Sequence, residues 1–394
     1  AAHAAGHRRV VVVAPPGSGK GTCAALLLAE AVADGQRALF VVHRREIVMD
    51  IAERVRALLP QQVGVILAGH DAEPHVPVQV ASVQTLLARE QRPAADLVIA
   101  DEAHHYKSAE WSPLLAAYPT ARIVGFTATP ERSDGQPLGD IFDRLVVAAH
   151  YSELIKAGHL VNCRVFQPPE ALGRDLAQEP VAAYQKFAAG SLAFCFVGGV
   201  KYAQDQCARF LAAGIPAAVV HANTAKAERD AAVREFKAGR VRVLVNVNVF
   251  SEGTDVPEAQ TVILARACDH ASTYLQATGR VLRPFPGKER ALLIDLTGAS
   301  LRHGLPTEDR VYSLDGRAIV AAGAPLVVCL KCGLTFAGTP PCPECGWMPE
   351  REAPRPPRIY SMELREVYAG VDTPGDAKAR EWARLCGLTI SKAW

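Results

Sequence analysis

The sequence predicts an α/β protein with two tandem domains, each a parallel sheet flanked by helices, followed by a small four-cysteine module. Short apolar runs alternate with helical patterns through the first three hundred residues, which is typical of parallel sheets covered by helices. The alternation restarts near residue 151, and 394 residues exceed what one core usually supports. We therefore expect domains at 1–150 and 151–305, the cysteine module at 306–350, and a linker with a short helical tail at 351–394.

Strands are expected where short apolar runs stand between turn residues. In the first domain these are residues 9–14, 38–42, 63–67, 78–82, 97–100 and 123–127, with helices at 47–59 and 82–89. In the second domain they are residues 191–197, 217–220, 241–245, 261–264 and 291–295. Two domains of similar size imply a cleft between them.

Composition limits the function classes. The net charge of +2 comes from 43 basic and 41 acidic residues, so any site for a polyanion must be local. Ten cysteines, four of them in two C-x-x-C pairs, favour a reduced compartment with a metal site. This cysteine usage predicts a cytoplasmic protein, and no apolar run is long enough for a membrane span, so no membrane partner is expected. The chain begins with Ala1 and reaches its first methionine at Met49, which suggests an upstream extension.

The stretch APPGSGKGT, residues 14–22, predicts a phosphate-binding loop. Gly17 and Gly19 permit backbone conformations that turn amides towards one point, and the helix that follows presents its positive end. Lys20 adds an ammonium that can reach the outer phosphates. A plain glycine turn is the alternative, but strand, loop, lysine and helix all occur in order. The expected nucleotide-binding residues are Pro16, Gly17, Ser18, Gly19, Lys20, Gly21 and Thr22.

Two adjacent carboxylates stand at the end of the apolar run 97–100, in the stretch LVIADEAHH. Asp101 could hold Mg²⁺, while Glu102 positions or deprotonates water. The pair could instead cap a helix. Its position after the phosphate loop favours the catalytic interpretation.

Four motifs occur in the order and spacing seen in superfamily 2 helicases: APPGSGKG at 14–21, DEAH at 101–104, TATP at 127–130 and QATGRVLR at 276–283. The chain thus resembles a DEAD/DEAH-box protein over residues 9 to about 300. The resemblance is closest to bacterial RadD-like DNA repair helicases and to the motor subunits of type III restriction enzymes. Further matching stretches are VVHRREIV at 41–48, ASVQTL at 81–86, VNVNVFSEGTDVP at 245–257 and PGK at 286–288.

The resemblance implies two RecA-like domains that bind ATP and Mg²⁺ in their cleft. The first domain would supply the phosphate loop with Asp101 and Glu102, and His104 and Thr127 would transmit the nucleotide state. The second domain would supply residues that approach the nucleotide and its γ-phosphate, namely Gly253, Asp255, Gln276, Arg280 and Arg283. Arginine suits this role because its planar, permanently charged fork can bridge phosphate oxygens.

Two departures from the family pattern stand out. Gly21 replaces the Ser or Thr whose hydroxyl normally binds Mg²⁺. Thr22 is rotated by about 100° from that position on a helix, so it does not simply substitute. We expect ATP binding to survive and hydrolysis to be sensitive to Mg²⁺ concentration. The family's adenine-reading glutamine is also missing, since only 19 residues precede Lys20.

A nucleic-acid track is the next implication of the resemblance. Its expected residues are Arg44, Arg45, Ser82, Gln84, Thr85, His221, Thr224, Asn246 and Asn248. Polar and basic side chains near strand ends and helix N-termini suit contacts to a phosphate backbone. Each residue alone could be an ordinary polar loop residue. No residue distinguishes DNA from RNA, and the likeness to repair and restriction motors favours DNA.

The stretch CLKCGLTFAGTPPCPECG, residues 329–346, spaces two C-x2-C pairs by nine residues. Two such knuckles make a closed tetrahedral sulfur site for Zn²⁺, which is structural and not catalytic. Its expected ligands are Cys329, Cys332, Cys342 and Cys345. A redox dithiol or unlinked cysteines are the alternatives, and a protein partner could dock on this module.

The leading interpretation of the sequence is an ATP-dependent DNA helicase or translocase. A nucleotide-gated DNA clamp with hydrolysis impaired by Gly21 is the main rival. A zinc scaffold with a vestigial motor is a third. The sequence leaves open the direction of movement, strand separation and the oligomeric state.

Overall fold

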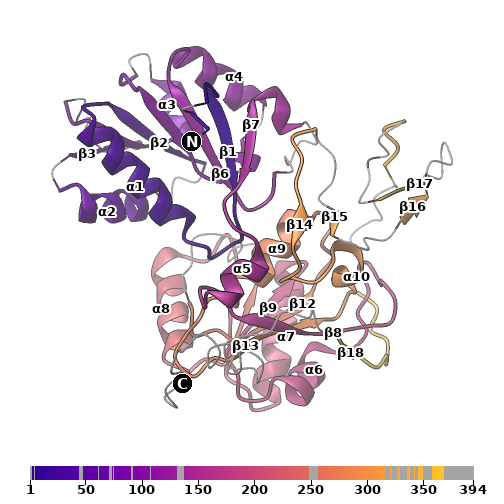
Figure 1. The fold of residues 1–394 in the computed structure, drawn as a ribbon. Helices are drawn as coiled ribbons and strands as arrows, with labels where there is room; N and C mark the ends of the chain where they lie inside the picture. The colour runs from indigo at the N-terminus through magenta and orange to yellow at the C-terminus, as the bar shows by residue number, and fades with distance from the viewer. Residues whose placement is uncertain are drawn as a thin grey trace, which may run out of the picture. The chain divides into compact units, whose positions relative to one another are not determined.

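The computed structural model divides into two compact units, Ala1–Ala149 with Tyr312–Ile319, and His150–Val311 with Val320–Trp394. Figure 1 shows the course of the chain through both. The structure describes residues 2–3, 5–43, 48–60, 62–70, 73, 75–89, 92–106, 108–130, 137–247, 256–315, 320–321, 326–328, 335–337, 341, 345–348 and 357–367.

The first unit is built on a 7-stranded sheet with the order β3-β4-β2-β5-β6-β1-β7. Every pairing in it is parallel. The strands are β1 Arg9–Val13, β2 Ala38–Val42, β3 Val63–Ile66, β4 Val78–Ser82, β5 Leu97–Ala100, β6 Arg122–Thr127 and β7 Arg144–Val147. Five of them, β2 to β6, contain almost only buried residues, as expected of strands covered on both faces.

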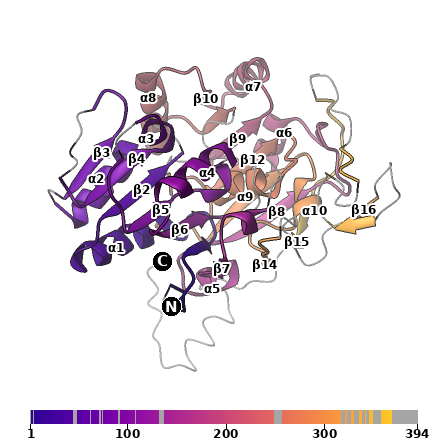
Figure 2. The same cartoon turned by 90° about the horizontal axis from the view of Figure 1, so that it is seen from above.

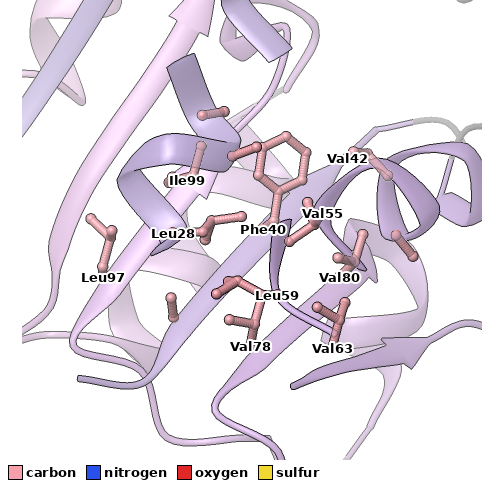
Figure 3. Packing of buried hydrophobic residues seen from close by; sticks show 14 of the residues in the cluster. Leu28, Phe40, Val42, Val55, Leu59, Val63, Val78, Val80, Leu97 and Ile99 are labelled. Carbon is pink, nitrogen blue, oxygen red and sulfur yellow. The ribbon is translucent and has the colours of Figure 1, made fainter. Parts of the chain in front are cut away.

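Helices cover both faces of this sheet (Figure 2). They are α1 Lys20–Ala33, α2 Val48–Leu58, α3 Val83–Ala88 and α4 Ser108–Ala117, with short 3-10 turns η2 Ala103–His105 and η3 Leu138–Asp140. Alternate residues of β2 enter two separate cores. Phe40 packs with Leu28 of α1 and Val55 of α2 (Figure 3), whereas Leu39 packs on the other face with Trp111 of α4. The period of two along a strand therefore divides the apolar residues between two helical layers.

The second unit has its own 7-stranded sheet, with the order β10-β11-β9-β12-β13-β8-β18. Its strands are β8 Asn162–Gln167, β9 Ala193–Val197, β10 Ala217–Val220, β11 Val243–Asn246, β12 Thr261–Ala265, β13 Arg290–Asp295 and β18 Arg365–Val367. Its helices are α5 Tyr151–Lys156, α6 Pro180–Phe187, α7 Val200–Ala212, α8 Lys226–Lys237, α9 Ala271–Gly279 and α10 Ala299–His303. Two small antiparallel pairs follow: β14 Arg310–Val311 with β15 Val320–Ala321, and β16 Leu326–Val328 with β17 Thr335–Ala337.

Residues beyond 367, where the short helical tail is expected, lie outside the described residues. Strand β18 lies within 351–394, where the sequence predicts a linker. It pairs antiparallel with β8 (Figure 1), and the guanidinium of Arg164 donates to both carboxylate oxygens of Glu366 at 2.8 and 2.7 Å. Just before it, Ile359 forms an isolated parallel bridge with Leu176. The chain therefore returns to the second sheet after the cysteine segment. The sequence did not predict this strand, because its three residues show no clear alternation of apolar and polar side chains.

Gly125 of β6 offers a test of packing in the first unit. A Cβ atom there would lie 2.4 Å from Cζ of Phe142 and 2.9 Å from Cβ of Ala103. The Phe142 ring is buried and packs edge-on against Trp111. We expect Gly125→Ala to lower the free energy of unfolding by about 1–3 kcal/mol, because the core has no room for the methyl group.

Denaturant unfolding of this variant is compared with Gly21→Ala. Gly21 lies in α1, where an added Cβ meets no atom within 4 Å, so that change should stabilise the helix by up to about 1 kcal/mol. Equal effects of the two substitutions would contradict this account of Gly125.

Candidate active site

The phosphate loop lies between β1 and α1. Gly17 and Gly19 have φ angles of 82° and 90°, which only glycine adopts without strain. Gly19 is the N-cap of α1 and has no side chain to satisfy the first amides of the helix. The loop therefore presents the N-terminal end of a 14-residue helix, the place where proteins bind anions.

Lys20 and Ser18 add the polar side chains of this loop. The ammonium of Lys20 donates to the carbonyl oxygens of Ala14 at 3.1 Å and Pro15 at 3.2 Å, which holds it over the loop. The hydroxyl of Ser18 is buried and has no hydrogen-bond partner among the described residues. A buried hydroxyl of this kind needs a partner that a bound phosphate or metal-bound water would supply.

The carboxylate pair follows β5 directly. The Asp101 side chain accepts a hydrogen bond from the Glu102 amide at 3.0 Å. Glu102 has a φ of 46°, and it is the one described non-glycine residue in the left-handed region. Such a conformation costs about 1–2 kcal/mol and persists only where the surrounding structure enforces it. Glu102 Oε2 is also buried without a hydrogen-bond partner in the described part of the chain.

A buried hydrogen-bond chain joins this turn to the end of β6. The hydroxyl of Thr127 donates to the carbonyl of Thr129 at 2.7 Å, so its oxygen is left to accept from Nδ1 of His104 at 2.8 Å. The protonated Nδ1 lies 3.4 Å from Glu102 Oε2. His104 therefore links the strained glutamate to the stretch TATP, as the family resemblance implies.

The side chains of Asp101, Ser18 and Lys20 have the chemistry to bind a nucleotide together with Mg²⁺. Asp101 is a hard oxygen ligand, and the buried hydroxyl and ammonium of the loop suit phosphate oxygens. Mg²⁺ bound by one carboxylate, phosphates and waters needs no protein cage. No cluster of three or more His, Cys, Asp or Glu that could hold a metal occurs among the described residues. The backbone at Gly21 is exposed.

Two of the expected nucleic-acid residues in the first unit lie in one hydrogen-bonded group. Ser82 is buried, and its hydroxyl donates to Oε1 of Gln84 at 2.9 Å. Gln84 is exposed and donates its amide to Glu110 of α4 at 3.1 Å. Thr85 is half-buried on the same helix, α3. Gln84 and Thr85 are therefore the accessible members.

In the second unit, His221 and Thr224 form the turn between β10 and α8. The backbone amide of His221 donates to the Thr224 hydroxyl at 3.0 Å, and both side chains are partly exposed. Asn246 differs from the expectation of a nucleic-acid contact. It is buried at the end of β11, and its amide lies 3.4 Å from the carbonyl oxygen of Cys195, to which it donates. The side chain packs into the sheet because this strand is covered on both faces.

The stretch 276–283 begins in α9. Gln276 is buried in this helix, whereas Arg280 and Arg283, which follow its end, are partly exposed. The sequence assigned no role to Lys288, although it is the lysine of the matching stretch PGK. Its ammonium is buried and donates to the carbonyls of Pro257 at 3.1 Å and Ala259 at 2.6 Å.

Burial is the main cause of a lowered pKa at Lys288, to about 7, and the nearby Arg283 charge lowers it further. Its two bonds tie the chain just after the stretch 245–257 to the chain just after Arg283. Lys288 therefore fixes the relative position of two motif segments in this unit.

Several expected site residues lie outside the described residues. They are Arg44, Arg45, Asn248, Gly253, Asp255, Cys329, Cys332 and Cys342. Of the four expected zinc ligands only Cys345 is described, so the zinc site stays a prediction. Four of the other cysteines, Cys163, Cys195, Cys207 and Cys268, are buried.

Comparisons with known proteins agree with this geometry. Residues 1–132 match the family model of the type III restriction enzyme res subunit, and residues 178–284 match that of the helicase conserved C-terminal domain. A 51.5 kDa protein of a Lactococcus phage is 30% identical over 318 residues, 75% of this chain and 67% of that protein. The DNA 3'-5' translocase XPB2 of Sulfurisphaera tokodaii is 25% identical over 354 residues, 73% of this chain and 77% of that protein.

The putative ATP-dependent helicase IRC3 of Saccharomyces cerevisiae is 27% identical over 300 residues, 67% of this chain. The chain spans only 44% of that yeast relative. Among solved structures, a fragment of a putative HsdR subunit of a type I restriction enzyme from Vibrio vulnificus has the same fold, with a TM-score of 0.62 at 19% identity. That match covers 80% of this chain and 64% of the fragment.

Two RecA-like units with a phosphate loop and an Asp-Glu turn define a nucleotide-dependent motor protein. The chain belongs to the ATP-hydrolysing superfamily 2 helicases and is related to the motor subunits of restriction enzymes. The resemblance drawn from the motifs is confirmed. None of the helices in the described ranges combines the length and apolar character of a membrane span.

Lys288 gives the second unit a specific pH dependence. In the unfolded chain a lysine stays protonated to about pH 10.4, whereas in the folded protein the pKa of Lys288 is about 7. Between these values the unfolded state binds more protons, so the free energy of unfolding rises with pH, by at most about 1.4 kcal/mol per unit. That gain is lost progressively as the pH falls from about 10.4 towards the folded-state pKa of about 7, and little of it remains below that value.

Urea unfolding from pH 7 to 9 measures this slope. Lys288→Met should show a smaller rise than the wild type, whereas Lys201→Met, at an exposed position of α7, should keep it. If the free energy of unfolding rises equally with pH in the wild type and in Lys288→Met, the lowered pKa assigned to Lys288 is refuted.

Proposed function

We propose that this chain is an ATP-dependent DNA helicase or translocase. The observation that best supports this function is the grouping of the phosphate loop, the Asp101–Glu102 turn and the His104–Thr127 hydrogen bond in the first unit. ATP is the nucleotide that the family implies. DNA is favoured because one relative is described as a DNA translocase and because the matched family is that of restriction enzymes.

The first unit supplies the chemistry of hydrolysis in this proposal. Gly17 and Gly19 open the loop for phosphate oxygens, and Lys20 exchanges its two carbonyl contacts for them. Asp101 would hold Mg²⁺, and the bound ion would neutralise charge on the phosphates. Glu102 orients the attacking water, and the His104 contact fixes its carboxylate.

The second unit is proposed to act on the same triphosphate. Arg280 and Arg283 would stabilise charge that develops on the γ-phosphate, and Gln276 would orient it. Gly253 and Asp255 would approach the nucleotide. Gln84, Thr85, His221 and Thr224 would contact the nucleic-acid backbone, which suits a motor that must grip every sequence.

A nucleotide-gated DNA clamp is the second candidate. It is favoured by one observation, the missing hydroxyl at Gly21. In that case the chain would bind ATP and DNA but hydrolyse little. Turnover measurements separate the two candidates.

We also keep as proposals a structural Zn²⁺ bound by Cys329, Cys332, Cys342 and Cys345, and a protein partner at that module. We further propose a role in DNA repair and a cytoplasmic location.

ATP turnover is the first test. We expect single-stranded or duplex DNA to stimulate hydrolysis more than RNA does. Glu102→Gln should lower the stimulated rate by about 10²- to 10⁴-fold, because water is no longer oriented or deprotonated. Lys20→Ala should abolish it through lost phosphate contacts. The exposed Lys201→Ala is the control. DNA binding without turnover in the wild type would favour the clamp.

The second test concerns Gly21. An added Cβ meets nothing within 4 Å, so the isosteric pair Gly21→Thr and Gly21→Val can be compared without a clash. The Thr hydroxyl adds a Mg²⁺ ligand, and the Val methyl does not. We expect only Gly21→Thr to lower the Mg²⁺ concentration for half-maximal ATPase. The same Mg²⁺ dependence in both variants would show that the missing hydroxyl has no such effect.

A further inference from the structure

A continuous set of contacts in the first unit joins Gln84 to Glu102. It passes through four residues that no motif role explains fully: His43, His104, His105 and Glu110, hereafter the histidine cluster. They come from the end of β2, the turn after β5, and α4. The cluster therefore lies between the exposed glutamine proposed to hold nucleic acid and the glutamate proposed to orient water.

Glu110 is the first link. One carboxylate oxygen accepts the Gln84 amide at 3.1 Å, and the other lies 3.7 Å from Nδ1 of His43. The first distance is a hydrogen bond, whereas the second is longer than one. Glu110 can therefore move towards His43 if its contact with Gln84 is released. Its side chain is about four-fifths buried, with 19% exposed, so water screens these contacts less than at the surface.

The imidazole rings are the second link. His43 stacks on His105 with ring centroids 5.8 Å apart, and the His105 ring lies 4.0 Å from that of His104. His43 also meets the ring of Tyr106 edge-on. Tyr106 is buried and donates to the carbonyl of Val41 at 2.8 Å, so this side of the cluster is fixed. A movement of the His43 ring would therefore displace the His105 ring, because Tyr106 blocks movement towards the core.

The third link reaches the catalytic turn. His104 is 2% exposed and donates to Thr127, and its Nδ1 is 3.4 Å from Oε2 of Glu102. Oε2 has no hydrogen-bond partner among the described residues, and Glu102 is held in a strained backbone conformation. A small displacement of the His104 ring therefore changes the contact that orients this carboxylate.

We propose that Glu110 is a positioning residue that couples nucleic-acid binding at Gln84 to the orientation of Glu102. The inference rests on the proposed function. A phosphate that accepts the Gln84 amide competes with the Glu110 carboxylate for it and repels that carboxylate. Glu110 then closes on His43, and the rings carry the shift to His104. In this proposal the same contacts also link nucleotide binding to nucleic-acid binding, and that coupling of affinities, unlike an effect on the hydrolysis rate, is reciprocal.

Two ratios test the proposal. The first is the ATPase rate with saturating single-stranded DNA divided by the rate without DNA. The second is the DNA dissociation constant without nucleotide divided by that with a non-hydrolysable ATP analogue. Glu110→Gln keeps the shape of the side chain but removes its charge. We expect it to lower both ratios by about fivefold or more, while DNA affinity without nucleotide changes little.

Two further variants sharpen the test. Glu53→Gln makes the same chemical change on the exposed face of α2 and should keep both ratios. In the double variant Gln84→Ala with Glu110→Gln, the two substitutions should be non-additive, because both break the same link.

Three results would overturn the inference. If Glu110→Gln keeps the wild-type ratios, the coupling does not pass through it, and the proposed function stands. If it weakens DNA binding equally with and without nucleotide, Glu110 is a binding residue only. If the wild type itself shows no stimulation by any nucleic acid, the proposed function falls together with the inference.

Discussion

Parallel pairing of the central strands in the first unit is the constraint on which the site depends. Val13 of β1 is in register with Thr127 of β6, and Ala100 of β5 is in register with Gly125. Because parallel strands end on the same edge, the phosphate loop, the Asp-Glu turn and the stretch TATP emerge side by side. The amide of Ala14 also donates to the carbonyl of Thr127 at 3.1 Å. Residues more than a hundred positions apart are thus brought together by backbone geometry.

The strained glutamate follows from the same packing. Directly behind the turn, Ala103 is buried and faces Gly125, which leaves no room for a larger residue. His104 is held by Thr127 on the other side. With Ala103 and His104 both held by packing and hydrogen bonding, Glu102 adopts a left-handed conformation that an unconstrained chain would avoid. The core below the site therefore determines how the Glu102 carboxylate is presented.

The second unit uses polar groups in a different way. Lys288 is buried against carbonyls and joins two motif segments, and Asn246 is buried at the end of β11, where its amide donates to the carbonyl of Cys195. Strand β18 closes one edge of the sheet with chain that comes from beyond the cysteine segment. In this unit the described polar residues of the motifs serve largely to hold the backbone in place. Among the expected site residues of this unit, Arg280, Arg283, His221 and Thr224 are partly exposed.

The sequence by itself determined the fold class and the motifs. Continuous apolar runs such as 38–42, 78–82 and 97–100 coincide with strands, because strands covered on both faces contain little else. The sequence did not predict β7, β8 and β18. Several residues of these strands are partly exposed, so their apolar pattern is weaker. The phosphate loop could be predicted from its glycines and lysine because its conformation depends on adjacent residues only. Only the tertiary structure placed Glu110 between Gln84 and His43, buried Asn246 and gave Lys288 its partners, because these contacts depend on how distant segments pack.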